Sequence, residues 1–430
     1  MSFQGVAMAA DSPTGYNPKD LPTAGCFWTG PFSASNPKTN VAYPGTEITY
    51  WGAKFATPPG AVLTLKGSYP HARYSSFNAY EAGGVSASSL NDSQIKPNAG
   101  SINPSRPGKN RSARNRSYEI KVRGEAKPSQ TARNTLYAAP IEGSHQDILY
   151  RVYVPDRGRS LSGGTGVPKP VLTLADGRRL EGQALCDELN SIHEYGSNLM
   201  PNAIYQSLVH TAGKDPETNP ALPGFQFRKF FNLPNAFSAY GTPEDQQAAW
   251  ARNPVEEGTQ YNNNDARYMT GAYSFKFGEV LALRGRMPTT PKTLNGQKKM
   301  KSGQLVEWDM CGIQALTTTK TYRCRFDEQI PVKGKKRKYV IAFAKAGLRP
   351  KNAKRECDVA WLPADPEGDG AGRTDVGLLL TRNVLPSQSF HKSIFDVSSP
   401  FNAEESMGDY YPKGDYTSKK AFESHGCPYK

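Results

Sequence analysis

An internal repeat constrains the fold of this chain more than any other feature of its sequence. The segment "GAVLTLKGSYP" at 60–70 recurs as "GEVLALRGRMP" at 278–288, with Gly, Val, Leu, Leu, Gly and Pro at the same positions. Self-similarity of this kind is the sequence signature of a repeated structural unit. We therefore expect two copies of one unit in the 430 residues, a length that exceeds one ordinary hydrophobic core.

Three more segment pairs follow in the same order. They are "DSQI" (92–95) with "DEQI" (327–330), "YEIKV" (118–122) with "YVIAF" (339–343), and "ILYRVYVP" (148–155) with "LLLTRNVLP" (378–386). Polar residues retained in both copies predict salt bridges and turn hydrogen bonds rather than a duplicated active site. The retained pairs are Asp92 with Asp327, Gln94 with Gln329, and Arg151 with Arg382.

The composition predicts a mainly β fold. The chain has 40 glycines and 34 prolines with 37% hydrophobic residues, and its short alternating segments are separated by turn formers. We expect two related antiparallel β-sandwich or jelly-roll-like units with an α-containing insert between them. The predicted organisation is an N-terminal segment (1–40), β unit 1 (41–155), a mixed insert with short helices (156–267), β unit 2 (268–390) and a C-terminal tail (391–430).

Cysteine usage and the N-terminus both indicate a secreted or periplasmic protein. Ala7, Met8 and Ala9 form a small-x-small pattern of the kind read by signal peptidase, and no apolar run is long enough to span a membrane. The six cysteines form no C-x-x-C pair, which favours up to three disulfides over a zinc or redox site. Of these, Cys311 and Cys324 are predicted to pair across a hairpin. The others are Cys26, Cys186, Cys357 and Cys427, the last of which would tie down the tail.

Several phrases resemble a group of uncharacterised secreted bacterial proteins. They include "YPHARYSSFNAY" (69–80), "VEWDMCGI" (306–313), "ECDVAWLPADP" (356–366) and the tail "MGDYYPKGDYTSKKAFESHGC" (407–427). More distantly, each half resembles a β-sandwich domain of unknown function whose "F-S-x-Y-D" phrase is altered here at Asn78 and Glu81. The resemblance implies the fold and secretion, and it transfers no catalytic residue.

The formal net charge of +14 favours an anionic partner, although a solvated basic surface would also explain it. Nucleic acid is disfavoured. The segment "NRSARNRSY" (110–118) lacks an RNA-binding strand motif, and the lysine clusters at 296–303 and 333–339 are predicted to form loops.

The segment at 69–80 differs between the copies, because the second copy has "TTPKTLNGQKKMKSGQ" after its proline and no His-x-Arg. As a strand it would place His71, Arg73, Ser75 and Phe77 on one face. A neighbouring arginine lowers the pKa of a histidine, so His71 is predicted to be a neutral base for an acidic substrate. The alternative is an edge strand whose polar face is solvated or packed on the insert. The catalytic candidates are His71, Arg73, Tyr74 and Tyr80.

Other chemistry finds weaker support. The sequence contains no nucleophile elbow and no metal-ligand spacing, so no metal and no cofactor are predicted. A pair of acids for glycoside hydrolysis would come from Glu47, Glu119, Glu279, Glu307 and Asp309, but sequence does not say which two converge. The ligand-binding candidates are Asn78, Trp51, Arg151 and Trp308.

These observations predict a secreted binding or accessory protein that holds an anionic or carbohydrate ligand in a cleft between the two β units. An extracellular polymer-degrading hydrolase or lyase is the alternative. A structural subunit of an extracellular assembly, such as a homo-oligomer, is a further alternative.

Overall fold

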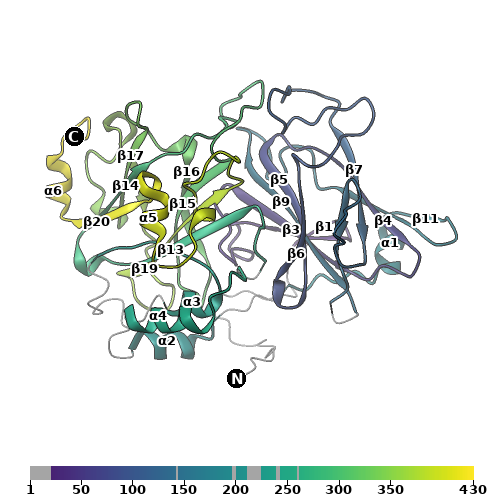
Figure 1. Cartoon of the computed structure of the whole chain (residues 1–430), viewed down its shortest axis with the longest axis horizontal. Coiled ribbons are helices and arrows are strands. Elements are labelled where there is room, and N and C mark those ends of the chain that lie inside the picture. The colour runs from purple at the N-terminus through teal and green to yellow at the C-terminus, as the bar shows by residue number, and fades with distance from the viewer. Residues whose placement is uncertain (1–20, 142–143, 196–199, 211–223, 239–242, 259–260) are drawn as a thin grey trace.

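The computed structural model describes residues 21–141, 144–195, 200–210, 224–238, 243–258 and 261–430 (Figure 1). The predicted signal-peptide remnant lies outside these residues. The chain is mainly β, as the sequence predicted, and its strands form two sandwich-like units. Unit 1 lies on the right of Figure 1 and unit 2 on the left. No helix among the described residues has the length and apolar character needed to cross a membrane.

Unit 1 packs two sheets face to face. The first has the order β1 (Thr23–Ala24), β2 (Trp28–Phe32), β3 (Ile48–Phe55), β9 (Gln146–Pro155), β5 (Ala72–Tyr80) and β6 (Ser86–Asn91). The second has the order β11 (Arg179–Leu180), β10 (Lys169–Thr173), β4 (Val62–Ser68), β7 (Ser117–Arg123) and β8 (Thr135–Tyr137). Their facing side chains, such as Phe77 and Tyr150 against Leu65 and Ile120, form one buried core.

Unit 2 repeats this arrangement. Its first sheet has the order β12 (Arg228–Lys229), β13 (Ala266–Ser274), β19 (Val376–Val384), β15 (Glu307–Ile313) and β16 (Thr321–Phe326). Its second has the order β18 (Ala360–Pro363), β17 (Lys338–Ala344), β14 (Val280–Arg286) and β20 (Lys413–Thr417). The helices are α1 (Gly182–Glu188), α2 (Asn202–His210), α3 (Leu233–Ser238), α4 (Pro243–Arg252), α5 (Ala403–Met407) and α6 (Lys419–Ser424).

The two units share one topology. The order β3-β9-β5-β6 corresponds to β13-β19-β15-β16, and β10-β4-β7-β8 corresponds to β20-β14-β17-β18. In both units the pairing is antiparallel except at one place, where β7 pairs in parallel with β8 and β17 with β18. Arg151 on β9 and Arg382 on β19 occupy the same register, since each lies opposite a tyrosine of the neighbouring strand, Tyr50 or Tyr268.

The residues retained in both units hold the same turn. The side-chain oxygen of Gln94 accepts a hydrogen bond from the amide of Asn91 at 3.0 Å, and Gln329 accepts one from Phe326 at 3.3 Å. Likewise, Asp92 accepts from the amide of Ser75 and Asp327 from the amide of Trp308. These are the turn contacts that the repeated "D-x-Q-I" phrase predicts.

Each unit extends beyond its predicted boundaries. β10 falls in the segment predicted as insert, yet it pairs with β4 in unit 1, and β20 of the predicted tail pairs with β14 in unit 2. Both are five-residue strands. β20 is at the edge of its sheet, whereas only the two-residue strand β11 lies outside β10. Strands this short carry little hydrophobic alternation, so sequence periodicity does not reveal them.

Three disulfides join all six cysteines. The predicted pair is confirmed, because Cys311 on β15 lies opposite Cys324 on β16. Cys26 pairs with Cys186 on α1, and Cys427 pairs with Cys357. The last bridge fixes the end of the chain, whose Phe422 and Tyr429 pack against the outer face of β14 and β17.

Replacing Cys357 and Cys427 together by serine should loosen the tail and leave the core of unit 2 folded. The bridge closes a long loop, and such a bridge contributes about 4 kcal/mol. Hydrogen exchange should therefore rise in residues 413–430 while β13 and β19 stay protected. The matched control replaces Cys26 and Cys186 by serine and should leave exchange of the tail unchanged. A tail that stays protected without its bridge would contradict this prediction.

The two units meet through the faces of their first sheets. Ile48, Tyr74 and Tyr153 of unit 1 pack against Ala266 and Val384 of unit 2 in one buried cluster. The part of the unit 2 face that unit 1 leaves uncovered is packed by α2, which contributes Tyr205 and Val209. The two sandwiches and the insert are thus joined by continuous packing.

A buried ion-pair cluster also spans this junction. The Arg73 guanidinium at the start of β5 contacts the carboxylates of Asp327 and Glu328 in unit 2, and its Nε donates to Thr293 Oγ1 at 3.2 Å. The side chains of Arg73 and Asp327 are fully buried, and 2% of that of Glu328 is exposed. Removing one partner of such a cluster leaves charge buried without compensation.

Replacing Arg73 by alanine should lower the free energy of unfolding by about 3–5 kcal/mol, because two carboxylates lose their buried counter-ion. Urea denaturation measures this loss. Lys66→Ala is the matched control, since Lys66 pairs with Glu119 at a surface where their side chains are 40% and 48% exposed. It should cost less than about 1 kcal/mol. Equal losses in the two variants would show that the cluster does not hold the units together.

Candidate functional site

A cavity of about 600 Å³ opens where loops of unit 1 meet a loop of unit 2. Ser68 at the end of β4 and His71 just before β5 line one side of it. The segment before β7 contributes Arg111, Ser112, Ala113, Arg114 and Arg116. Residues between 156 and 165, which follow β9, close another side. Unit 2 contributes Gly296 and Gln297, which belong to the loop that the sequence shows only in the second copy.

A glycine-rich loop packs directly on the His71 turn. The amide of His71 donates to the carbonyl of Gly163 at 3.0 Å, and the amide of Asp156 donates to the carbonyl of His71 at 2.8 Å. Gly163 has a φ of 67°, and a Cβ there would lie 2.6 Å from Cβ of Pro70. Only glycine permits this backbone and this approach. The "SGGTG" stretch therefore holds a wall of the cavity in place.

Arg111 joins the loops of the two units. Its guanidinium forms an ion pair with Asp156 and donates to the carbonyls of Ala72 and Gln297. Its backbone amide donates to the carbonyl of Lys298 at 2.9 Å. Arg111 is 5% exposed, so these contacts are shielded from water and hold the cavity's shape.

Arg116 presents a buried charge with unused donors. It is 5% exposed, and its one hydrogen bond, to the carbonyl of Arg111 at 2.6 Å, uses Nη2. Its Nε and Nη1 are buried and have no hydrogen-bond partner among the described residues. Burial lowers the pKa of Arg116 to about 10, with nearby Arg111 adding to the effect, so the side chain stays charged at neutral pH. Arg116 lines the cavity, so an acceptor there would satisfy these donors after a small movement of the side chain that exposes them.

The corresponding arginine of unit 2 has no such unused donors. Arg337 occupies the same register, since its carbonyl accepts from Met287 as that of Arg116 accepts from Tyr69. Its Nε donates to the carbonyl of Met287 at 3.0 Å and its Nη2 to that of Pro288 at 3.2 Å. The fold can therefore supply backbone acceptors to an arginine at this position. In unit 1 it supplies none to Nε and Nη1 of Arg116 among the described residues.

His71 lines the cavity as a neutral base. Burial, together with the positive charges of Arg116 and Arg159, lowers its pKa from 6.5 to about 4, against the opposing effect of Asp156. The direction agrees with the sequence prediction. The cause differs, because burial and these arginines replace Arg73 as the source. At neutral pH the imidazole is uncharged.

The lining as a whole favours an anion. It holds the four guanidinium groups of Arg111, Arg114, Arg116 and Arg159 against the single carboxylate of Asp156, a surplus of three positive charges. No phenylalanine, tyrosine or tryptophan lines it. Guanidinium groups bind carboxylate, sulfate and phosphate oxygens well, whereas a neutral sugar would need a stacking ring.

The other catalytic candidates are buried away from the cavity. Arg73 is in the ion-pair cluster of the junction. The hydroxyl of Tyr74 donates to Asp265 at 2.8 Å, and that of Tyr80 donates to the carbonyl of Asn262 at 3.0 Å. The edge-strand interpretation is wrong, because β5 lies between β9 and β6 and all of its residues are buried. Its polar face packs on the end of the predicted insert.

The four ligand-binding candidates also lie inside the protein. Trp51 and Trp308 are 4% and 2% exposed and belong to the cores of units 1 and 2. Arg151 donates to the side-chain oxygen of Asn78 at 2.6 Å and to the carbonyl of Tyr261. Of the eight candidates, the structure places only His71 at the cavity.

The sequence analysis missed the arginines of the cavity. Arg111, Arg114 and Arg116 fall in "NRSARNRSY". The sequence indicates only that this segment lacks an RNA-binding strand motif. Arg159 precedes the glycine-rich loop. The signal in the sequence is the close spacing of these three arginines, which fall within six residues. They belong to the first copy, whose segment 69–80 differs from the second copy.

Comparisons with known proteins identify no family and no activity. No family model matches the chain, and no curated protein does. Among solved structures, an uncharacterized protein from Burkholderia cenocepacia is similar over 93% of this chain and 84% of its own, with 14% identity and a TM-score of 0.48. The VPA0106 protein from Vibrio parahaemolyticus is similar over 93% and 92%, with 10% identity and a TM-score of 0.39. These structural neighbours are uncharacterised bacterial proteins.

In anion-free buffer, His71 should titrate near pH 4 rather than at its ordinary value of 6.5. NMR of the imidazole, assigned with His71→Gln, measures this. The contribution of His71 to stability, measured as the difference between wild type and His71→Gln, should fall as the pH drops from about 6.5 to about 4, because at this residue only the unfolded chain takes up the proton in that window. Added sulfate should move the midpoint upward, because a bound anion favours the imidazolium. A midpoint near 6.5 that sulfate does not move would contradict the description of the cavity.

Proposed function

We propose that this is a secreted binding protein that holds an anionic ligand in the arginine-lined cavity between its two β units. The single observation that carries the proposal is Arg116, a buried guanidinium whose Nε and Nη1 have no partner. A buried charged donor without an acceptor is unfavourable by about 1–3 kcal/mol or more. A carboxylate, sulfate or phosphate group would fill both positions and would also neutralise the surplus charge of the lining.

Two further features support secretion and repetition. All six cysteines are paired, which fits an oxidising compartment such as the periplasm or the cell exterior. The shared strand order of the units supports an origin by internal duplication. In this account, the copies later diverged at two places. One is the loop of residues 289–304, and the other is the environment of the corresponding arginines, Arg116 and Arg337.

An enzyme is the second candidate, because His71 is a neutral base in a cavity that would bind an acid. A lyase removes a proton beside a carboxylate, and such a step needs an uncharged base and positive charge nearby. The distinction from a binding protein is product release. Turnover of an acidic polysaccharide that His71→Gln abolishes, with binding retained, would favour the enzyme.

Calorimetric titration with inorganic sulfate and with an acidic oligosaccharide, polygalacturonate fragments, tests the proposal. Arg116→Gln should weaken binding by about 10- to 100-fold, the value of one charge-assisted hydrogen bond. Arg337→Gln removes the corresponding arginine of unit 2, which does not line the cavity, and should change affinity by less than about twofold.

Two results would overturn the proposal. One is wild-type protein that binds neither anion at low ionic strength. The other is equal affinity in the Arg116→Gln and Arg337→Gln variants. A neutral oligosaccharide such as maltoheptaose is the ligand control, and we expect no binding of it because the lining lacks aromatic rings.

A further inference from the structure

Three carboxylates converge at the junction, away from the cavity. Glu47 comes directly before β3 of unit 1, and Glu307 and Asp309 lie on β15 of unit 2. One oxygen from each lies within 4.8 Å of the others. Glu307 and Asp309 have no exposed surface. Two segments of the chain, one from each unit, thus bring three acids to one buried point.

Within the part of the chain that the structure describes, four oxygens of this group have no hydrogen-bond donor. They are both oxygens of Glu307, Oδ1 of Asp309 and Oε1 of Glu47, and all four are buried. The other Asp309 oxygen accepts from Arg382 at 2.7 Å, and the other Glu47 oxygen accepts from Thr46 at 3.0 Å. A fully buried carboxylate with neither oxygen partnered is very unfavourable, so Glu307 in particular requires a positive ligand or a proton.

The ion pairs next to these acids balance one another. Arg73 and Lys292 pair with Asp327 and Glu328, two positive charges for two negative. Arg382 pairs with Asp309. Among the described residues, Glu47 and Glu307 are the members of this group that form no ion pair with a lysine or arginine.

Arg325 is a further cation whose charge acts on this group, beside those of Arg73 and Arg382, which act on Glu307. The positive charge of Arg325 reaches Glu47, but its guanidinium donates to the carbonyls of Trp361 and Cys324. It therefore supplies no hydrogen bond to the free oxygens. A single divalent cation would neutralise the remaining two negative charges.

The scaffold does not require these acids. In unit 1, Tyr74 and Ser76 occupy the places of Glu307 and Asp309, by the pairing of β5 with β9 and of β15 with β19. The corresponding arginine, Arg151, is satisfied there by an amide and a carbonyl. The acids are therefore a special feature of unit 2.

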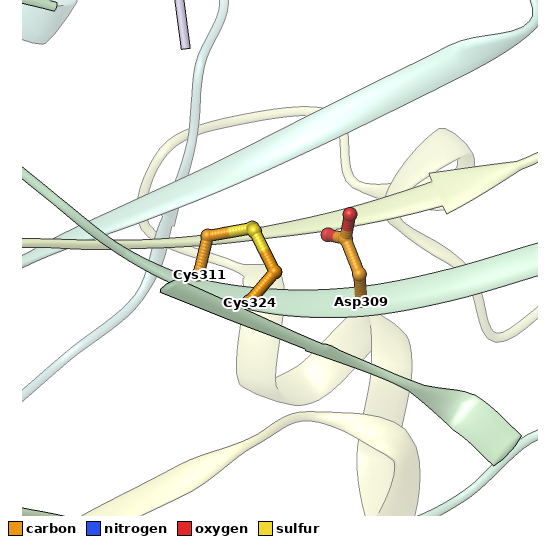
Figure 2. Close-up of side chains that lie close together, drawn as sticks. All are labelled: Asp309, Cys311 and Cys324. Atoms are coloured by element: carbon orange, nitrogen blue, oxygen red, sulfur yellow. A yellow bond between two sulfur atoms is a disulfide. The ribbon is translucent and has the colours of Figure 1, made fainter. Parts of the chain in front are cut away.

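We propose that Glu47, Glu307 and Asp309 bind one divalent cation, Ca²⁺ or Mg²⁺, that links the two units. The donors are all carboxylate oxygens, which prefer these hard cations. Calcium binds oxygens at about 2.3–2.6 Å, so oxygens on opposite sides of one ion lie up to about 5 Å apart, which suits the observed spread. Asp309 also lies beside Cys311 and Cys324, but their sulfurs form a disulfide and supply no thiolate ligand (Figure 2).

A proton is the competitor for this site. Burial, together with Glu47, raises the pKa of Glu307 well above its ordinary value, and burial does the same for Asp309. The sequence could not show the site, since its ligands are about 260 residues apart and follow no metal-binding spacing.

Metal analysis and thermal unfolding test the proposal. The purified protein should contain about one equivalent of Ca²⁺ or Mg²⁺, and its Tm should rise with the free concentration of that ion and fall in EDTA. Sodium chloride at equal ionic strength should not reproduce the rise. Glu307→Gln should remove both the bound ion and its effect on Tm. Glu119→Gln changes an exposed strand carboxylate of unit 1 and should keep both.

Protein that holds no ion, and whose Tm neither Ca²⁺, Mg²⁺ nor EDTA changes, would overturn the proposal. In that case Glu307→Gln should raise the Tm, because an amide would replace a protonated acid. If Glu307→Gln does not fold, Glu47→Gln at the half-buried end of the group gives the same readouts. Loss of the ion in that variant supports the site, and retention of it contradicts the site.

Discussion

Arg73 extends from unit 1 into unit 2 and meets Asp327 and Glu328 where water is excluded. An ion pair of this kind is strongly unfavourable when either side is missing, so it makes the two sandwiches depend on each other. Glu328 also accepts a hydrogen bond from the amide of Leu294, in the loop that unit 2 contributes to the cavity. The contact that joins the units therefore also positions the loop that completes the candidate site.

The two units show what the shared fold requires and what each unit has changed. Tyr118 and Tyr339 each pack over a glycine, Gly67 or Gly285, where a side chain would clash. By contrast, Arg337 is satisfied by backbone carbonyls while Arg116 is not. Comparing corresponding residues of the two units thus separates those that the shared fold requires from those that are candidates for function. On this criterion, Arg116 and the acids near Arg382 are the positions where function is to be sought.

The sequence predicted the mainly β fold and the paired units because strand alternation and the "D-x-Q-I" turn are local patterns. It also predicted the bridge between Cys311 and Cys324, whose residues face each other in one hairpin. It did not predict β10 or β20, since strands of five residues lack a clear pattern.

The site was harder to predict than the fold. The sequence led to His71, which is at the cavity, and to Arg73, which is not. The two residues are neighbours in sequence, but one precedes β5 and the other is enclosed by unit 2. Only the packing of loops from both units brings Arg111, Arg116 and Arg159 together, and no spacing within one segment encodes such packing.

The central claim is that loops of two similar units build one cavity that binds an anion. Diffraction from crystals soaked in selenate, an anomalously scattering analogue of sulfate, tests it most directly. The account predicts an anomalous peak within hydrogen-bond distance of Nε and Nη1 of Arg116. Selenate bound elsewhere on this basic protein, with the cavity free of any peak, would contradict it.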